Sequence, residues 1–168
     1  MRLSKSLLGL VSTVVALCQQ PAVISVQGLE GKPVTLTADD LAKLPHHAIK
    51  ASEHGTSATF EGVLLSDVLA TVNLPTGEKL RGKALTQYLL VEAADGYPVV
   101  FALPELDPAC TSQPAYLVTK RDRKPLSEKE GMFRIVVPAE KRPARWVRQV
   151  TALKLKQAEQ LSANLCSA

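Results

Sequence analysis

Aromatic residues are scarce in this sequence. They make up 4% of its 168 residues, and Trp146 is the only tryptophan. Proteins that bind single-stranded nucleic acid usually interleave several aromatic platforms with basic residues. Here a basic cluster lies between Arg134 and Arg148, where Trp146 is the one aromatic side chain, and two charges of the net +4 belong to Arg2 and Lys5 at the N-terminus. The composition therefore argues against nucleic acid as a partner.

The sequence also lacks the motifs of several enzyme classes. It has no GxSxG nucleophile motif, no HExxH zinc motif, no P-loop and no dinucleotide-binding fingerprint. The three histidines, His46, His47 and His54, have no cysteine or carboxylate beside them at the spacing of zinc ligands. No metal site is therefore predicted.

Long apolar runs are missing as well, so no internal membrane span is predicted. Residues 1–18 have the pattern of a signal peptide: two basic residues, the apolar run Leu7–Leu17, and small residues at Ala16 and Cys18. This pattern predicts export to the periplasm or beyond the cell. One alternative is a membrane anchor, for which the apolar run is too short. The other is a lipoprotein lipidated at Cys18, and the large Leu17 before it argues against that.

Cysteine is rare too, with three residues in the chain. Once the signal peptide is removed, Cys110 and Cys166 remain, and neither has CxxC or metal-ligand spacing. In an oxidising compartment an even pair of cysteines favours a disulfide. Such a bridge would pin the tail, residues 157–168, to the loop after Asp107. The alternative is two unpaired thiols.

Short alternating and apolar segments dominate the rest of the chain, which is typical of a protein with many short strands. Asp95-Gly96 is the strongest hairpin-turn signal. Glu61-Gly62 is interpreted as a turn that leads into a helix. The predicted strands cover residues 22–27, 33–36, 46–52, 58–60, 87–94, 97–102, 116–120, 133–137 and 146–156.

Helices are predicted to be few and short. Thr37 and Asp40 resemble a capping box at the start of a helix that Pro45 stops. A second helix is predicted to begin near Leu65, and residues 104–107 form a helical turn. Many short strands with few helices indicate an α+β fold, and residues 19–156 are predicted to form one domain.

Five segments then follow one another in a specific order. They are Phe60–Leu69, Asp95-Gly96-Tyr97 with Phe101–Leu106, Tyr116–Val118 with Lys124–Leu126, Gly131 with Arg134–Pro138, and Ala144–Arg148. Together they resemble the motifs of the sulfite oxidase-type molybdopterin-binding domain superfamily, over residues 23–156. The resemblance implies mixed β-sheets with short helices, and a cleft that binds a pterin.

One feature of that family is missing. Its catalytic members hold molybdenum through a cysteine thiolate, in a segment that corresponds to Ala51–Ser57 and has no cysteine here. Serine or histidine does not replace a soft thiolate ligand without loss of the site's chemistry, and Cys110 lies too far along the pattern. The sequence therefore resembles a short stand-alone form without a direct molybdenum ligand, and redox catalysis is disfavoured.

A pterin requires a flat group to stack on and a carboxylate that accepts from its two adjacent N–H groups. Arg145 beside Trp146 is the favoured contact. Core packing is the alternative role of Trp146, and a solvated surface is the alternative for Arg142 and Arg148. The predicted ligand-binding residues are Glu53, His54, Asp95, Glu140, Arg142, Arg145, Trp146 and Arg148.

The resemblance extends to small periplasmic pterin-binding regulators of cyclic-di-GMP enzymes. It implies a non-catalytic protein that binds a reduced pterin or a molybdopterin-like cofactor and signals to the periplasmic region of an inner-membrane cyclic-di-GMP enzyme. One alternative is a molybdopterin-dependent oxidoreductase with atypical metal ligation. Another is a module that binds a different small anion through the basic cluster 141–148.

Overall fold

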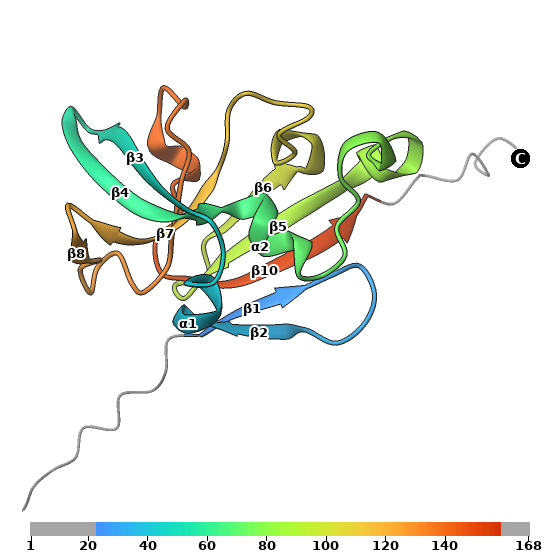
Figure 1. Cartoon of the computed structure of the whole chain (residues 1–168), viewed down its shortest axis with the longest axis horizontal. Coiled ribbons are helices and arrows are strands. Elements are labelled where there is room, and N and C mark those ends of the chain that lie inside the picture. Colours follow the sequence, from blue (N-terminus) through green and yellow to red (C-terminus); the bar gives the residue numbers. More distant parts are fainter. Residues whose placement is uncertain (1–22, 159–168) are drawn as a thin grey trace, which may run out of the picture.

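The computed structural model describes residues 23–158 and arranges them around two five-stranded β-sheets (Figure 1). In the first sheet β1 and β10 run parallel and the other neighbours are antiparallel. The strands of this sheet, in spatial order, are β2 (Val34–Thr37), β1 (Val23–Gln27), β10 (Val150–Gln157), β5 (Gln87–Ala93) and β6 (Pro98–Ala102).

The second sheet is antiparallel throughout. Its strands are β3 (His46–Glu53), β4 (Thr56–Leu64), β7 (Tyr116–Arg121) and β8 (Lys124–Pro125), with β9 (Arg134–Val136) also paired to β7. The β3–β4 hairpin projects from the body of the molecule beside the segment that precedes β10 (Figure 1). The α+β fold with mixed sheets is therefore confirmed.

The helices are short, as predicted. The capping box before the first helix is present, because Thr37 Oγ1 accepts from the Asp40 amide at 3.2 Å and Asp40 accepts from the Thr37 amide at 3.0 Å. No helix among residues 23–158 is long and apolar enough to cross a membrane. The helices are α1 (Ala38–Leu41), α2 (Leu65–Ala70) and the 3-10 turns η1 (Gly77–Lys79), η2 (Gly82–Thr86), η3 (Leu103–Glu105) and η4 (Pro143–Arg145).

The core collects the inward-facing residues of both sheets into one hydrophobic cluster. In β1 the alternation buries Ile24 and Val26 completely, and the same period buries Leu89 and Val91 in β5. Aliphatic side chains of this size each contribute about 1.5–3 kcal/mol when they are fully buried. The alternation read from the sequence thus identifies the faces that hold the sheets together.

The predicted turn at Glu61-Gly62 is wrong, because β4 continues through it to Leu64. A bulge lies between Glu61 and Gly62, where β4 pairs with β7. At Gly62 the neighbouring strand approaches so closely that an added Cβ would overlap the Leu117 carbonyl oxygen and lie 2.5 Å from Val118 Cα. The glycine permits close strand contact instead of marking a turn.

The predicted start of the last strand is also wrong. The strand begins at Val150, four residues later than expected, after η4 and an irregular segment in which Gln149 has φ 50°. In this segment the Val147 carbonyl accepts from Ile135 in the second sheet, and the Gln149 carbonyl accepts from Ala94 at the end of β5 in the first. A segment that bridges two sheets cannot pair along one of them.

Gly62→Ala is expected to lower the free energy of unfolding by about 2–3 kcal/mol, because the new methyl group must displace the β7 backbone. Urea unfolding followed by circular dichroism measures this. Gly55→Ala is the control: Gly55 has φ 81° but no atom within 4 Å of an added Cβ. In the control variant only the strain of a left-handed alanine backbone remains, which lowers the free energy of unfolding by about 1 kcal/mol. Equal losses in the two variants would contradict the close-approach explanation.

Candidate functional site

Two cavities flank the segment Pro143–Arg148 that leads into β10. The first has a volume of about 370 Å³ and the second about 650 Å³. Both volumes are in the usual range for small-molecule sites. Pro143, Ala144, Trp146 and Arg148 line both cavities, so this segment forms their shared wall.

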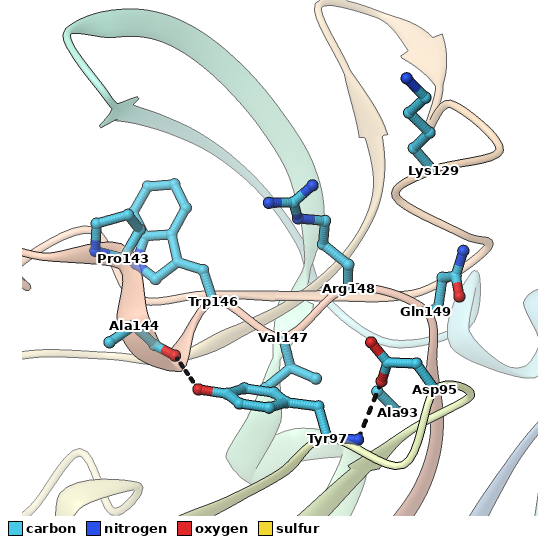
Figure 2. A pocket seen from close by; sticks show the side chains of 10 residues that line it. All are labelled: Ala93, Asp95, Tyr97, Lys129, Pro143, Ala144, Trp146, Val147, Arg148 and Gln149. Atoms are coloured by element: carbon cyan, nitrogen blue, oxygen red, sulfur yellow. Dashed lines mark hydrogen bonds between the residues drawn. The ribbon is translucent and has the colours of Figure 1, made fainter.

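The first cavity opens beside the β5–β6 turn (Figure 2). In this turn the Asp95 carboxylate accepts from the Tyr97 amide at 3.0 Å, and the Tyr97 hydroxyl donates to the Ala144 carbonyl at 3.2 Å. The tyrosine thereby ties the hairpin to the shared wall. The remaining lining residues are Ala93, Lys129, Val147 and Gln149.

The second cavity lies between the shared wall and the tip of the β3–β4 hairpin. His54, with φ 50°, and Gly55, with φ 81°, form the two-residue turn between Glu53 and Thr56, which face each other across the hairpin. This is the backbone pattern of a tight hairpin turn. Ser52, Lys141 and Arg142 complete the lining with Glu53, His54 and Gly55.

Four cations surround the cavities without a protein partner. All four side chains are exposed, and among residues 23–158 none of them makes a hydrogen bond or an ion pair. These cations are Lys129, Lys141, Arg142 and Arg148. Arg148 stands between the cavities and projects away from the ribbon (Figure 2). Unpaired cations that converge on a concave surface favour an anionic ligand.

By contrast, Arg134 is a buried cation held by two protein carboxylates, although its Nε atom has no hydrogen-bond partner among residues 23–158. Its side chain is 1% exposed and donates to Glu53 and Glu130, each at 2.6 Å. The guanidinium carbon also lies 5.5 Å from the ring centre of Phe60 and 5.6 Å from that of Trp146. Arg134 therefore fixes Glu53, which lines the second cavity, to the turn that carries Glu130.

The carboxylates around Arg134 have perturbed pKa values. Burial alone would raise the pKa of Glu53, but the hydrogen bond and charge of Arg134, together with the nearby charges of Arg148 and His54, outweigh burial and lower it below its ordinary value of 4.5. Burial likewise opposes the shift at Glu130, where hydrogen bonds from Ser127 and Arg134 lower the pKa. Both carboxylates are therefore more acidic in the folded chain than in the unfolded one.

This shift predicts acid sensitivity. A carboxylate with a lowered folded pKa contributes stability that is fully present above its unfolded pKa and is lost as pH falls through the folded value. We expect the free energy of unfolding to decrease steadily below about pH 4.5, as urea titrations at several pH values would show. The double variant Glu53→Gln/Glu130→Gln should have a flatter profile. If the double variant lost stability with falling pH as steeply as the original protein, Glu53 and Glu130 would not be the source of the acid sensitivity.

Arg145, the favoured ligand contact from sequence, is occupied by protein carboxylates. It donates to Glu105 and Glu140, each at 2.6 Å, and its guanidinium carbon lies 4.5 Å from the centre of the Phe101 ring. Burial would lower the Arg145 pKa, but the hydrogen bonds to both carboxylates raise it. Arg145 and Glu140 line neither cavity; they brace η4 against η3.

Trp146 is a core residue with one edge on the cavities. It is 5% exposed, its ring meets Phe60 edge to face at 6.0 Å, and its indole N–H donates to the Val137 carbonyl at 3.0 Å. This is the core-packing role that was the alternative for this residue. The buried ring cannot offer its whole face to a ligand.

The remaining predicted site residues do come together. Glu53, His54 and Arg142 line the second cavity, Asp95 lines the first, and Arg148 lines both. Sequence reasoning missed Lys129, Tyr97 and Arg134 as site residues. A signal for Arg134 exists: it is a charge inside the apolar strand 133–137, and buried charges are almost always paired. Nothing local marks Lys129.

The donor atoms near the cavities do not fit molybdenum held by a thiolate. Ala51–Ser57 is the tip of the β3–β4 hairpin and carries no sulfur. Within residues 23–158, no three His, Cys, Asp or Glu side chains gather as metal ligands, and the one cysteine, Cys110, is exposed in the turn after Asp107. Cys166 and the signal-peptide pattern lie outside the described residues, so the disulfide and export remain predictions.

Comparison with known proteins supports the fold alone. No family model matches the chain, and no curated protein matches it significantly. Among solved structures, the sulfane dehydrogenase SoxCD from Paracoccus pantotrophus is similar, with a TM-score of 0.63 and 21% sequence identity. The match covers 87% of this chain but only 41% of that one, so this chain spans less than half of its length. The likeness agrees with the sulfite oxidase-type fold that the sequence motifs indicate.

Proposed function

We propose that this chain is a periplasmic, non-catalytic protein that binds a pterin-type ligand in the first cavity and signals to the periplasmic region of an inner-membrane cyclic-di-GMP enzyme. The observation that carries the proposal is the lining of the first cavity, where two unpaired cations, Lys129 and Arg148, accompany the Asp95 carboxylate, which no protein cation binds within residues 23–158. The fold, the missing thiolate and the predicted signal peptide support it further.

The first cavity offers the chemistry that a pterin needs. The Asp95 carboxylate makes no hydrogen bond within residues 23–158 other than the one from its own turn, so it can accept from the two adjacent N–H groups of the pyrimidine edge. The Tyr97 side chain, 50% exposed, provides a ring on the same wall. Arg148 and Lys129 line the same cavity, where they can bind an anionic substituent of the pterin ring.

Of the three carboxylates predicted from sequence, Asp95 is the one that protein cations leave free. Glu53 is bound by Arg134, and Glu140 by Arg145. A ligand that bound either of these carboxylates would first have to break its ion pair with the arginine. The free energy lost with that ion pair exceeds the free energy gained from the ligand, unless the arginine finds a new partner. We therefore propose the first cavity, with Asp95, as the site of the pterin ring.

Isothermal titration calorimetry of the protein with a tetrahydropterin tests the proposal. Saturable one-to-one binding is expected, together with a higher melting temperature at saturating ligand. If neither reduced nor oxidised pterins bind, the proposal is wrong. Stoichiometric molybdenum in protein from the native host would favour the oxidoreductase instead, and binding of inorganic phosphate alone would favour a simple anion module.

Asp95→Asn provides the residue-level prediction. The amide keeps one acceptor oxygen but replaces the other with a donor, so the pairing with two N–H groups is lost. We expect the tetrahydropterin Kd to rise about tenfold, since a charge-assisted hydrogen bond contributes about 1.5–3 kcal/mol. Glu128→Gln, an exposed carboxylate that lines neither cavity, is the control and should leave the Kd unchanged. Equal effects would refute the role of Asp95.

A further inference from the structure

We infer that the chain carries a docking groove for its own C-terminal segment, residues 159–168, and that a Cys110–Cys166 disulfide locks this segment in place. The inference is independent of ligand binding. It rests on an apolar groove beside Cys110, on where β10 ends, and on the positions of leucine and cysteine in the segment that follows.

The groove is apolar and lies beside the turn that carries Cys110. It has a volume of about 210 Å³. Pro108 and Thr111, on either side of Cys110 in sequence, belong to its lining, and the Cys110 side chain is exposed. The apolar part of the groove consists of Leu64, Leu106, Pro108, Pro114, Ala115 and Tyr116.

The Cys110 turn is held rigidly. The Asp107 carbonyl accepts from the Cys110 amide at 2.9 Å, and one Asp107 carboxylate oxygen accepts from the Ala109 amide at 2.8 Å. The other oxygen accepts from the Gly77 amide at the start of η1. Asp107 is 4% exposed. A cysteine on a fixed turn loses little conformational freedom when it forms a bridge.

The last described residue lies near the same elements. The Ala158 amide donates to the Thr86 carbonyl at the end of η2 at 2.9 Å. η2 packs against η3, the turn that leads into the Cys110 loop, and β10 ends on the side of the molecule where η1 and η2 lie (Figure 1). The eight residues that follow Ala158, up to Cys166, span at most about 26–29 Å when extended, and in our proposal this reach carries Cys166 past these turns to Cys110.

The segment has the chemistry that the groove requires. Leu165 immediately precedes Cys166, and Leu161 lies four residues before Leu165. A leucine beside the bridge can bury its side chain between the prolines and Tyr116, which contributes to docking in proportion to the apolar area removed from water. The segment also contains a single charged side chain, Glu159, at its far end from Cys166, so docking desolvates little charge.

Formation of the bridge requires an oxidant, and a small-molecule disulfide of the glutathione class is sufficient. The Cys110 or Cys166 thiolate attacks the external disulfide and releases one small thiol, and the second cysteine then displaces the other. One external disulfide is reduced to two thiols, and two protein thiols are oxidised to one disulfide. Electrons and protons therefore balance.

The experiment equilibrates the full chain, with Cys18→Ser to remove a competing thiol, in mixtures of reduced and oxidised glutathione. Free thiols are then alkylated and the protein is digested with trypsin. We expect a disulfide-linked pair of peptides, residues 84–120 and 157–168. Leu165→Asp should lower the equilibrium constant of the bridge at least about tenfold, because it removes docking that raises the effective concentration of the thiols. Ser167→Asp is the control, with the same charge on the other side of Cys166, and should change it less than about threefold.

Each remaining outcome overturns the inference. Two free or glutathione-capped cysteines at saturating oxidant would show that Cys166 does not reach Cys110. A linked pair with equal effects of Leu165→Asp and Ser167→Asp would show proximity without docking in the groove. Neither result bears on tetrahydropterin binding, so failure here is distinguishable from failure of the proposed function.

Discussion

Arg134→Met is expected to lower the free energy of unfolding by about 3–5 kcal/mol, the usual cost of removing one partner from a buried ion pair. Arg134 is 1% exposed and binds two carboxylates that are themselves largely buried. Methionine can fill the space between Phe60 and Trp146, but it leaves Glu53 and Glu130 without the cation that compensates their charge. Guanidinium chloride unfolding followed by tryptophan fluorescence measures the loss directly, because Trp146 lies against the substituted side chain.

Arg121→Met is the matched control. Arg121 also lies 5.5 Å from the Phe60 ring centre and contacts Glu130 at 3.4 Å, but its side chain is 30% exposed. Solvent screens such a pair, so its loss should cost at most about 1 kcal/mol. If the two variants were equally destabilised, the contact with Phe60, and not the burial of charge, would be the source of the effect.

A charge-free variant separates the lost ion pairs from the lost packing. In Arg134→Met/Glu53→Gln/Glu130→Gln no buried charge lacks a partner, and replacement of a whole buried ion network is often close to neutral. We expect this triple variant to be more stable than Arg134→Met alone. A triple variant as unstable as the single one would mean that the guanidinium acts mainly through packing.

The strands were largely predictable because their signals are local. Alternation located β1, a strongly apolar run located β5, and Asp95-Gly96 located the hairpin that returns along β6. The exceptions depend on contacts distant in sequence. Gly62 was predicted to lie in a turn, but a glycine is required there because the β7 backbone, some 55 residues away in sequence, approaches too closely for a side chain. The parallel pairing of β1 with β10 likewise leaves no mark in either strand.

The site was less predictable for the same reason. Arg145 and Arg148 stand three residues apart in one basic run, and the run does not show which of them meets a carboxylate. Glu105, which engages Arg145, lies 40 residues earlier and is brought close by η3. The hairpin tip with Glu53 was predicted as part of the site, but its partner Arg134 lies 81 residues later. Only the fold distinguishes bracing cations from those that remain free.

Arg148→Glu is expected to weaken tetrahydropterin binding about 100-fold or more. Loss of a charge-assisted hydrogen bond costs about 1.5–3 kcal/mol, and the reversed charge adds repulsion toward any anionic substituent. The residue is exposed and makes no hydrogen bond or ion pair within residues 23–158. The free energy of unfolding should therefore change little, and calorimetry should show a defect in binding alone.

Two variants test whether position matters or only total charge. Arg123→Glu makes the same charge change in the exposed turn between β7 and β8, outside both cavities, and should shift the Kd less than about threefold, because salt screens charges beyond roughly 8–10 Å. Arg145→Gln removes the cation that holds Glu105 and Glu140, so it should affect stability more than the Kd. If Arg145→Gln abolished binding while Arg148→Glu did not, the ligand would lie against η4 and η3, and the first cavity would lose its assignment. If all three variants weakened binding alike, the ligand would be attracted by net charge alone and no specific cavity would be implied.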